Sequence, residues 1–190
     1  MLFCGIDEAG RGPLAGPVVV AAVIIPSFQK IEGVKDSKRL SERKRHILFE
    51  KITEYAIEYK ISVVDNKTID DMNILQSTML GIEECIRSLT CKPDKYIIDG
   101  NYLKLRNDYH KGINYETIVK GDDKFYEISC ASIIAKVTRD KIMQNYDTSY
   151  PVYGFCSNKG YGTKKHISAI KKHGICPIHR KSFLRNIILS

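Results

Sequence analysis

Four acidic side chains that follow apolar segments are the residues of this sequence best suited to chemistry. Asp7 and Glu8 are adjacent near the start of the chain, Asp99 ends the segment KYIID, and Asp122 follows YETIVK and a glycine. Two carboxylates about 4 Å apart in a partly buried site repel each other by about 4 kcal/mol, so such a cluster requires cations. Oxygen ligands favour Mg²⁺ or Mn²⁺. Two such ions about 3.5–4 Å apart can hydrolyse phosphodiesters.

A sheet is needed to bring these acids together. Residues 2–8 and 17–25 are predicted strands, and the second is apolar at nearly every position, which predicts burial on both faces. The glycines and Pro13 between them predict a hairpin turn. Strand ends at one edge of an α/β sheet are a common ligand-binding position, and all four acids are placed there.

The remaining elements follow from apolar spacing and capping residues. Ser41 and Thr68 are predicted N-caps of two helices. Further helices are predicted over 129–145 and 163–173, and further strands over 60–64, 95–99 and 115–120. The order is roughly β-β-α-β-α-β-β-α-α, which predicts one mixed sheet with helices packed on it.

Alternation along a strand poses a difficulty for the first two acids. Neighbouring side chains on an ideal strand point to opposite faces, so Asp7 and Glu8 share a site only if the backbone turns there. Gly5, Gly10 and Gly12 would allow such a turn. In the alternative interpretation Glu8 points to solvent and Asp7 caps a turn.

The segment Gly10-Arg11-Gly12 is a second candidate for ligand contact. Glycine lets a ligand approach the backbone closely, and successive N–H groups in a turn can hold an anion. Arg11 adds a positive charge. The alternative is an ordinary hairpin connection.

The net charge of +8 is concentrated in the last part of the chain. Residues 148–190 contain eight Lys or Arg and no Asp or Glu, which indicates a polyanionic partner such as nucleic acid. The same segment carries YPVYGFCSNKGYGTKKH, whose aromatic and basic residues suit stacking on sugar or base beside phosphates. Tyr161, between two glycines, is predicted to be exposed; the alternative is a core tyrosine flanked by turns.

Other readings of the composition are less favoured. The six cysteines form no C-x-x-C pair and are expected to be free thiols. His173, Cys176 and His179, with His166 upstream, could bind zinc, but their spacing matches no standard finger and basic neighbours disfavour a cation. Asp7 and Glu8 lie where a signal peptide would be apolar, so a cytoplasmic protein is expected.

The motifs together resemble one family over essentially the whole chain. GIDEAGRGPLAGPVVVAAVI resembles the opening motif of ribonuclease HII, the type 2 ribonuclease H of bacteria. DSKRLSERKR, DMNIL, IIDGN, VKGDDKFYEISCASIIAKVTRD, YGFCSNKGYGTKKH and HRKSF are similar to that family's later blocks, in the same order. The resemblance implies an α/β fold, a ribonuclease H-like mixed β-sheet flanked by helices. It also implies a catalytic domain over 1–147 and a helical basic C-terminal extension over 148–190, packed on that domain and binding substrate.

The resemblance also implies an activity and roles for residues. The expected enzyme cleaves RNA in RNA–DNA hybrids and cuts 5′ of single ribonucleotides embedded in duplex DNA, leaving 3′-hydroxyl and 5′-phosphate ends. The implied ligands of two Mg²⁺ or Mn²⁺ ions, which are also the catalytic residues, are Asp7, Glu8, Asp99 and Asp122. Asp122 is preferred to Asp123 because it directly follows Lys120 and Gly121, as in the family pattern.

The substrate-binding residues follow from the same blocks. The backbone of Gly10, Arg11 and Gly12 is expected to read the 2′-hydroxyl, the group that distinguishes RNA from DNA. Tyr161 is expected to pack on the sugar of the next nucleotide. Phosphate contacts are expected from Lys38, Lys136 and Arg139.

Two other classes of function were weighed against this one. A non-catalytic nucleic-acid-binding module would use the basic tail but would have no use for four acids facing a polyanion. Another nuclease or integrase on the same fold would cleave all-DNA duplex. We expect a monomer with no obligate protein partner and no membrane association.

Overall fold

Five strands form one mixed sheet in the computed structural model, which describes every residue except 27, 29, 35–39 and 189–190. The spatial order is β3-β2-β1-β4-β5. The strands are β1 (Phe3–Ala9), β2 (Val18–Ile24), β3 (Glu58–Val64), β4 (Lys95–Asp99) and β5 (Tyr115–Ile118). β1 pairs antiparallel with β2 and parallel with β4, and β5 continues the parallel half. This is the predicted mixed sheet.

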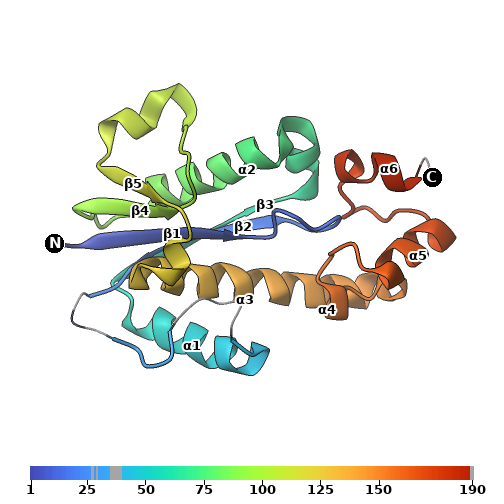
Figure 1. Cartoon of the computed structure of the whole chain (residues 1–190), viewed down its shortest axis with the longest axis horizontal. Helices are drawn as coiled ribbons and strands as arrows, with labels where there is room; N and C mark the ends of the chain where they lie inside the picture. The colour runs from blue at the N-terminus through green and yellow to red at the C-terminus, as the bar shows by residue number, and fades with distance from the viewer. Residues whose placement is uncertain (27, 29, 35–39, 189–190) are drawn as a thin grey trace.

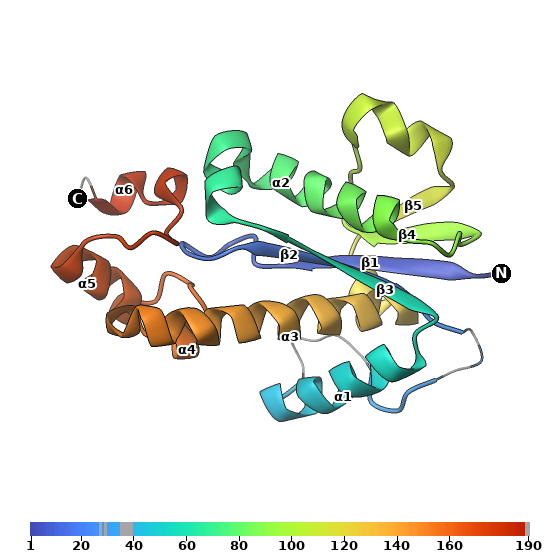
Figure 2. The ribbon, with the colours of Figure 1, turned by 180° about the vertical axis from the view of Figure 1, so that it is seen from behind.

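Helices cover both faces of the sheet (Figures 1 and 2). The α-helices are α1 (Glu42–Tyr55), α2 (Asn66–Ser88), α3 (Tyr126–Ser149), α4 (Phe155–Asn158), α5 (Lys164–His173) and α6 (Arg185–Ile188). Short 3₁₀ turns are η2 (Arg106–Gly112), η3 (Gly121–Asp123), η4 (Pro151–Tyr153) and η5 (Lys181–Phe183). α2 lies on one face, α1 and α3 lie on the other, and α4 to α6 gather at the end of the molecule away from the N-terminus.

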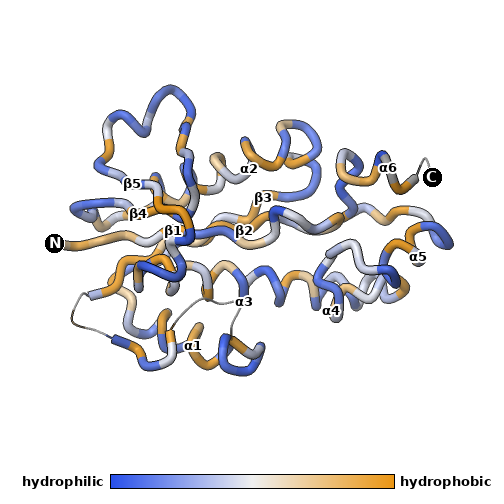
Figure 3. Tube along the Cα trace, in the orientation of Figure 1, coloured by the Kyte–Doolittle hydropathy of each residue, from blue (hydrophilic) through white to orange (hydrophobic). Residues whose placement is uncertain are grey.

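β2 explains why the core has two halves. All of its residues are buried, as its apolar run predicts. Val19, Ala21 and Val23 pack in the cluster that contains residues of α1 and α3. The alternate residues Val20 and Ala22 pack in the cluster that contains residues of α2. A strand covered on both faces has no polar side, and the hydropathy of the trace in Figure 3 is consistent with this.

Several predicted boundaries are wrong. Thr68 is not an N-cap: the cap is Asp65, whose carboxylate accepts the Thr68 N–H at 2.8 Å. α2 also breaks at Asn73, which has φ of 70° and whose side chain accepts the Gln76 N–H, so a second cap restarts the helix. The strand predicted over 115–120 ends at Ile118. The helix predicted over 129–145 spans Tyr126–Ser149.

The C-terminal elements pack on the end of α3 and on the β1–β2 connection. A separate apolar cluster joins Ala15 and Met143 to Phe155, Ile170 and Leu184. An isolated bridge pairs Ala15 with His179, and the Gly16 N–H donates to the Ile178 carbonyl at 2.9 Å. The last part of the chain is therefore built into the same packing unit as the first hairpin. Within the described residues, none of the helices has the length and apolar character that a membrane span needs.

Candidate active site

A cavity of about 380 Å³ opens where β1 runs beyond β4. The pairing between these two strands ends at Ile6 and Ile98, so the edge of β1 that faces β4 is open from Asp7 onward. This gap at the carboxyl ends of parallel strands is where ligands bind in open α/β sheets. The lining residues are Asp7, Glu8, Ala9, Gly10, Arg11, Gly12, Asp99, Ser132, Lys136, Arg139 and Tyr161.

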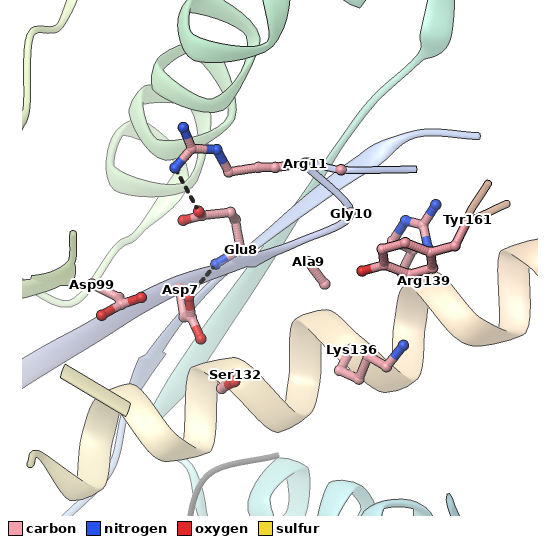
Figure 4. A pocket seen from close by; sticks show the side chains of 11 residues that line it. Asp7, Glu8, Ala9, Gly10, Arg11, Asp99, Ser132, Lys136, Arg139 and Tyr161 are labelled. Carbon is pink, nitrogen blue, oxygen red and sulfur yellow. Dashed lines mark hydrogen bonds and ion pairs between the residues drawn. The ribbon is translucent and has the colours of Figure 1, made fainter. Parts of the chain in front are cut away.

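The first two acids reach this cavity without the predicted turn of the backbone. β1 stays regular through Ala9, with Asp7 opposite Ala21 and Glu8 opposite Val20. In Figure 4 the Asp7 side chain points toward Asp99 and α3, and the Glu8 side chain leaves the other side of the strand. Both line the cavity because β4 no longer pairs with β1 at this level. A turn is therefore not needed for both acids to line the cavity. The alternative, in which Glu8 points to solvent and Asp7 caps a turn, is wrong, because both residues lie in β1 and line the cavity.

Asp99 links the end of β4 to the next acidic segment. Its Oδ1 accepts the N–H of Gly121 at 2.7 Å. Asp122 follows in η3 and is buried, and its carbonyl oxygen accepts the Ser129 hydroxyl at 2.6 Å. Asp122 is not among the cavity-lining residues of the described chain, whereas the other three acids are. The structure therefore brings three of the four acids to one cavity and connects the segment of the fourth by a hydrogen bond.

The electrostatics of Asp7 favour a cation. Burial is the main cause that raises the pKa of its carboxyl well above the usual value, and the charges of Glu8 and Asp99 raise it further. The hydroxyl of Ser132 and the Glu8 N–H, which donates to Asp7 Oδ1 at 2.7 Å, act in the opposite direction. A divalent cation would neutralise this concentration of negative charge, and the oxygen-only donor set suits Mg²⁺ or Mn²⁺. Among the described residues, no three acidic, His or Cys side chains already form a group that could hold a metal ion.

The glycine turn lies beside these acids. Gly10 has φ of +98°, and a Cβ there would lie 2.0 Å from Nε of Arg139, so both conformation and space require glycine. Arg11 is half exposed, and one of its guanidinium nitrogens lies 3.4 Å from Glu8 Oε1. Gly10, Arg11 and Gly12 thus line the cavity together, and their contact with a ligand stays a prediction.

Two buried arginines hold the connection between β1 and β2, and Arg180 contacts the glycine turn itself. Arg180 donates to the carbonyl oxygens of Gly10, Arg11 and Gly16 at 2.6–3.0 Å. Arg139 donates to those of Ala15, Pro17 and Lys159 at 2.9–3.1 Å. Burial lowers the pKa of Arg180 to about 9 and that of Arg139 to about 10, so both remain charged at neutral pH.

Arg180, which supports the glycine turn, is a residue that the sequence does not single out. Its block HRKSF was recognised, but no property of the sequence distinguishes this arginine from the basic residues around it. Only its burial and its three carbonyl partners mark it as part of the site.

Three of the other four predicted substrate residues, Tyr161, Lys136 and Arg139, line the cavity. Tyr161 is 46% exposed and lines the cavity, with its ring 3.7 Å from the position that a Cβ on Gly12 would take. Lys136 also lines the cavity, and its ammonium lies 2.8 Å from Asp140 Oδ1. Arg139 lies under the Tyr161 ring, 6.0 Å from its centre (Figure 4). Lys38 lies outside the described residues.

The residues of the zinc alternative are used differently. His166 and His179 are buried and contact each other through their Nε2 atoms at 3.0 Å, and Cys176 Sγ lies 3.1 Å from His179 Nδ1. His173 is exposed at the end of α5. The ring nitrogens of His166 and His179 are used in contacts within the protein, which leaves neither ring available as a zinc ligand in this arrangement.

Comparison with known proteins agrees with this geometry. A family model described as ribonuclease HII matches residues 4–186. A ribonuclease HII of Endomicrobium trichonymphae is 56% identical over 179 residues, which cover 94% of this chain and 83% of the relative. The crystal structure of ribonuclease H2 from Pyrococcus horikoshii OT3 superposes with a TM-score of 0.80 at 30% identity, covering 100% of this chain and 98% of the other.

A more distant structure shares the fold. Bst-RNase HIII in complex with Mn²⁺ has a TM-score of 0.69 at 22% identity, covering 92% of this chain and 63% of the other. The sheet with its flanking helices is thus the ribonuclease H fold. The chain belongs to the ribonuclease HII family, whose members cleave RNA in RNA–DNA hybrids, and is a ribonuclease H enzyme.

Proposed function

We propose that this enzyme also cuts 5′ of single ribonucleotides embedded in duplex DNA, and that it does so by hydrolysis with two divalent cations, leaving 3′-hydroxyl and 5′-phosphate ends. This proposal rests on one observation: three carboxylates, the glycine turn and Tyr161 line the same cavity. The carboxylates suit cleavage of a phosphodiester, and the turn and the tyrosine suit inspection of the neighbouring sugar.

The residues that would hold the cations are Asp7, Glu8, Asp99 and Asp122. Bound Mg²⁺ or Mn²⁺ would supply a water of lowered pKa and charge stabilisation at the leaving oxygen. The side chains of Asp7 and Asp99 lie next to each other in Figure 4, which suits two acids that share a cation. The hydrogen bond from Gly121 to Asp99 orients one carboxylate oxygen and keeps the segment of Asp122 beside it. Mn²⁺ is bound by the distant relative Bst-RNase HIII, which agrees with this donor set.

The glycine turn would read the 2′-hydroxyl through its backbone. The carbonyls of Gly10 and Arg11 are occupied by Arg180, so these peptide units are fixed before substrate arrives. A preorganised donor or acceptor costs no reorganisation when the substrate binds. A ribose hydroxyl placed there would gain a hydrogen bond that a deoxyribose cannot make.

Phosphate contacts would come from the basic residues around the cavity. Lys136 lines it directly. The guanidinium of Arg139 donates to three carbonyls, so we assign it a contribution of positive charge beneath the substrate together with support for the Tyr161 ring. Lys38 completes the set proposed from the sequence.

The remaining proposals concern the whole molecule. We assign catalysis to residues 1–147 and substrate binding to the basic segment 148–190, whose exposed lysines on α5 extend the positive surface beside Tyr161. We propose a cytoplasmic monomer that acts in removal of ribonucleotides from DNA.

A cleavage assay with three duplexes tests this function. The substrates are an all-DNA duplex, a duplex with one ribonucleotide and a full RNA–DNA hybrid, each with Mg²⁺, with Mn²⁺ and with chelator. We expect metal-dependent cleavage of the second and third substrates, with a 3′-hydroxyl end 5′ of the ribonucleotide. Cleavage of the all-DNA duplex, or cleavage in chelator, would contradict the proposal.

A further inference from the structure

A buried histidine holds the backbone of Tyr161. His166 lies in the first turn of α5 and is fully buried. Its Nδ1 lies 2.9 Å from the carbonyl oxygen of Tyr161. A carbonyl oxygen only accepts, so the proton of this neutral imidazole lies on Nδ1. The same carbonyl accepts the N–H of Thr163 at 2.8 Å, and the two donors fix the peptide unit that follows the tyrosine.

A second buried histidine fixes the first. The backbone N–H of Cys176 donates to Nδ1 of His179 at 2.9 Å, so this nitrogen carries no proton. The proton of a neutral His179 therefore lies on Nε2, which is 3.0 Å from Nε2 of His166. His166 Nε2 is free to accept, because the proton of that ring is on Nδ1. The result is a directional chain of hydrogen bonds from Cys176 through His179 and His166 to the carbonyl of Tyr161.

The surroundings keep both rings neutral and fixed. Both histidines are buried, and the rings of Tyr153 and Phe155 pack against them, with centroids 4.9 Å from His179 and 5.3 Å from His166. A further proton would place two N–H groups face to face at 3.0 Å. In agreement with this, burial lowers the pKa of both histidines.

The anchor adds to hydrogen bonds on the N-terminal side of this segment: the Gly160 carbonyl accepts the Leu14 N–H at 2.8 Å, and the Asn158 carbonyl accepts the N–H of Tyr161 at 2.9 Å. The residue lies between two glycines, and Gly160 has φ of +85°, a region that glycine enters without cost. The 46% exposed ring lies over the cavity. The same short segment that supplies His179 also supplies Arg180, which holds the carbonyls of the glycine turn. Two consecutive residues thus tie Tyr161 and the turn to one piece of backbone.

We propose that His166 and His179 are positioning residues that hold Tyr161 over the cavity. The anchor itself does not depend on the proposed function, but its expected effect on the reaction rests on it. That effect is a larger loss of cleavage at a single ribonucleotide than of cleavage of a long hybrid. Neither histidine lines the cavity, so their effect on the reaction passes through Tyr161.

A fluorescent reporter tests the anchor without any need for activity. The sequence contains no Trp, so Tyr161→Trp creates a single tryptophan at the position in question. In this background we expect His166→Leu to lower the fluorescence anisotropy, since the anchoring donor is lost. His166→Asn keeps a donor close to the position of Nδ1 and is expected to restore the anisotropy. If the leucine variant does not fold, His166→Gln replaces it, because glutamine places its amide near Nε2 and leaves Tyr161 without the donor.

Cleavage kinetics test the consequence. We expect His166→Leu or His179→Leu to lower kcat/KM on the single-ribonucleotide duplex about tenfold relative to the hybrid, the effect of about one hydrogen bond. In a Tyr161→Ala background the same variants should change this ratio no further. Unchanged anisotropy in His166→Leu, or an equal loss with and without Tyr161, would overturn the positioning role. Lowered anisotropy in an enzyme that cleaves only long hybrids would support the anchor and overturn the proposed function.

Discussion

Asp99 and Gly121 are joined by a hydrogen bond of 2.7 Å from the Gly121 N–H to Asp99 Oδ1. Asp99 is the last residue of β4, and Gly121 lies just after β5, the parallel strand beside it. The hydrogen bond therefore joins the end of β4 to the turn that carries Asp122. The carboxylate of Asp99 therefore has one oxygen committed to the protein. Its orientation, and the position of η3 beside it, depend on the same bond.

Gly121→Ala should separate this orientation from the chemistry of the acids. A Cβ at Gly121 would lie 2.6 Å from Cδ1 of Ile128 and 3.4 Å from Asp99 Oδ1, so either the buried Ile128 side chain or the turn must shift. We expect kcat on a hybrid to fall about tenfold to a hundredfold, because small displacements of catalytic groups are costly. Gly112→Ala is a matched control, since a Cβ there meets nothing within 4 Å. Equal activity of the two variants would show that the position of the Gly121 turn does not limit catalysis.

Asp7→Asn should abolish cleavage and stabilise the protein without metal. Burial is the main cause that raises the pKa of the Asp7 carboxyl, and the charges of the neighbouring Glu8 and Asp99 raise it further. Removing a repelling charge from an active site is expected to increase the free energy of unfolding by about 1 kcal/mol. Urea unfolding in chelator and in Mg²⁺ measures this, and the gain should shrink in Mg²⁺. Asp123→Asn, an exposed neighbour of the fourth acid, should change neither property; a stable, active Asp7→Asn variant would refute the assignment.

The sheet and the acids could be predicted because their signals are local. β2 is an unbroken apolar run, and Ser41 caps α1 by accepting the Lys44 N–H, so short windows of sequence contain the decisive information. The start of α2 was misjudged because Asp65 and Thr68 are both capping residues, and the backbone at Asp65 decides between them.

The support of the site could not be predicted because it joins distant parts of the chain. Arg180 contacts carbonyls about 170 positions earlier, and in the sequence it is one more basic residue of a basic tail. His166 and His179 were considered as zinc ligands, since composition does not show that their rings bond each other. The sequence alone could not show that Asp7 and Glu8 line one cavity without a turn, because the point at which β4 stops pairing with β1 is a property of the assembled sheet.

Arg180→Met should destabilise the protein strongly. The variant leaves the carbonyls of Gly10, Arg11 and Gly16 without their buried donor. Breaking a buried charged network costs about 3 kcal/mol or more, and thermal unfolding measures it. Arg180→Lys keeps the charge but cannot reach three carbonyls and should be intermediate. The exposed Arg185→Met is the control, and an equal effect of both substitutions would show that Arg180 has no special role.

The histidine pair should make stability fall in mild acid. Burial and the neighbouring His166 lower the pKa of His179 to about 4, whereas an unfolded histidine has a pKa of about 6.5. The unfolded state then takes up the proton first, so stability falls as pH decreases from about 6.5 to about 4, by up to about 1.4 kcal/mol per pH unit. Urea unfolding at several pH values should show a flatter profile for His179→Leu and an unchanged one for the exposed His173→Gln. Parallel profiles for the parent protein and His179→Leu would contradict this.

Tyr161→Ala should alter substrate preference rather than chemistry. The Tyr161 ring lines the cavity on one side of the glycine turn, and the carboxylates lie on the other side of the turn (Figure 4). We expect kcat/KM on a duplex with one ribonucleotide to fall about tenfold or more, since stacking on one unit of nucleic acid contributes about 1–3 kcal/mol. Cleavage within a long hybrid should fall less, because it offers many registers. Tyr55→Ala, at 43% exposure similar to Tyr161 and located at the end of α1, should affect neither substrate. An equal loss on both substrates for Tyr161→Ala would assign the ring to general binding instead of recognition of the RNA–DNA junction.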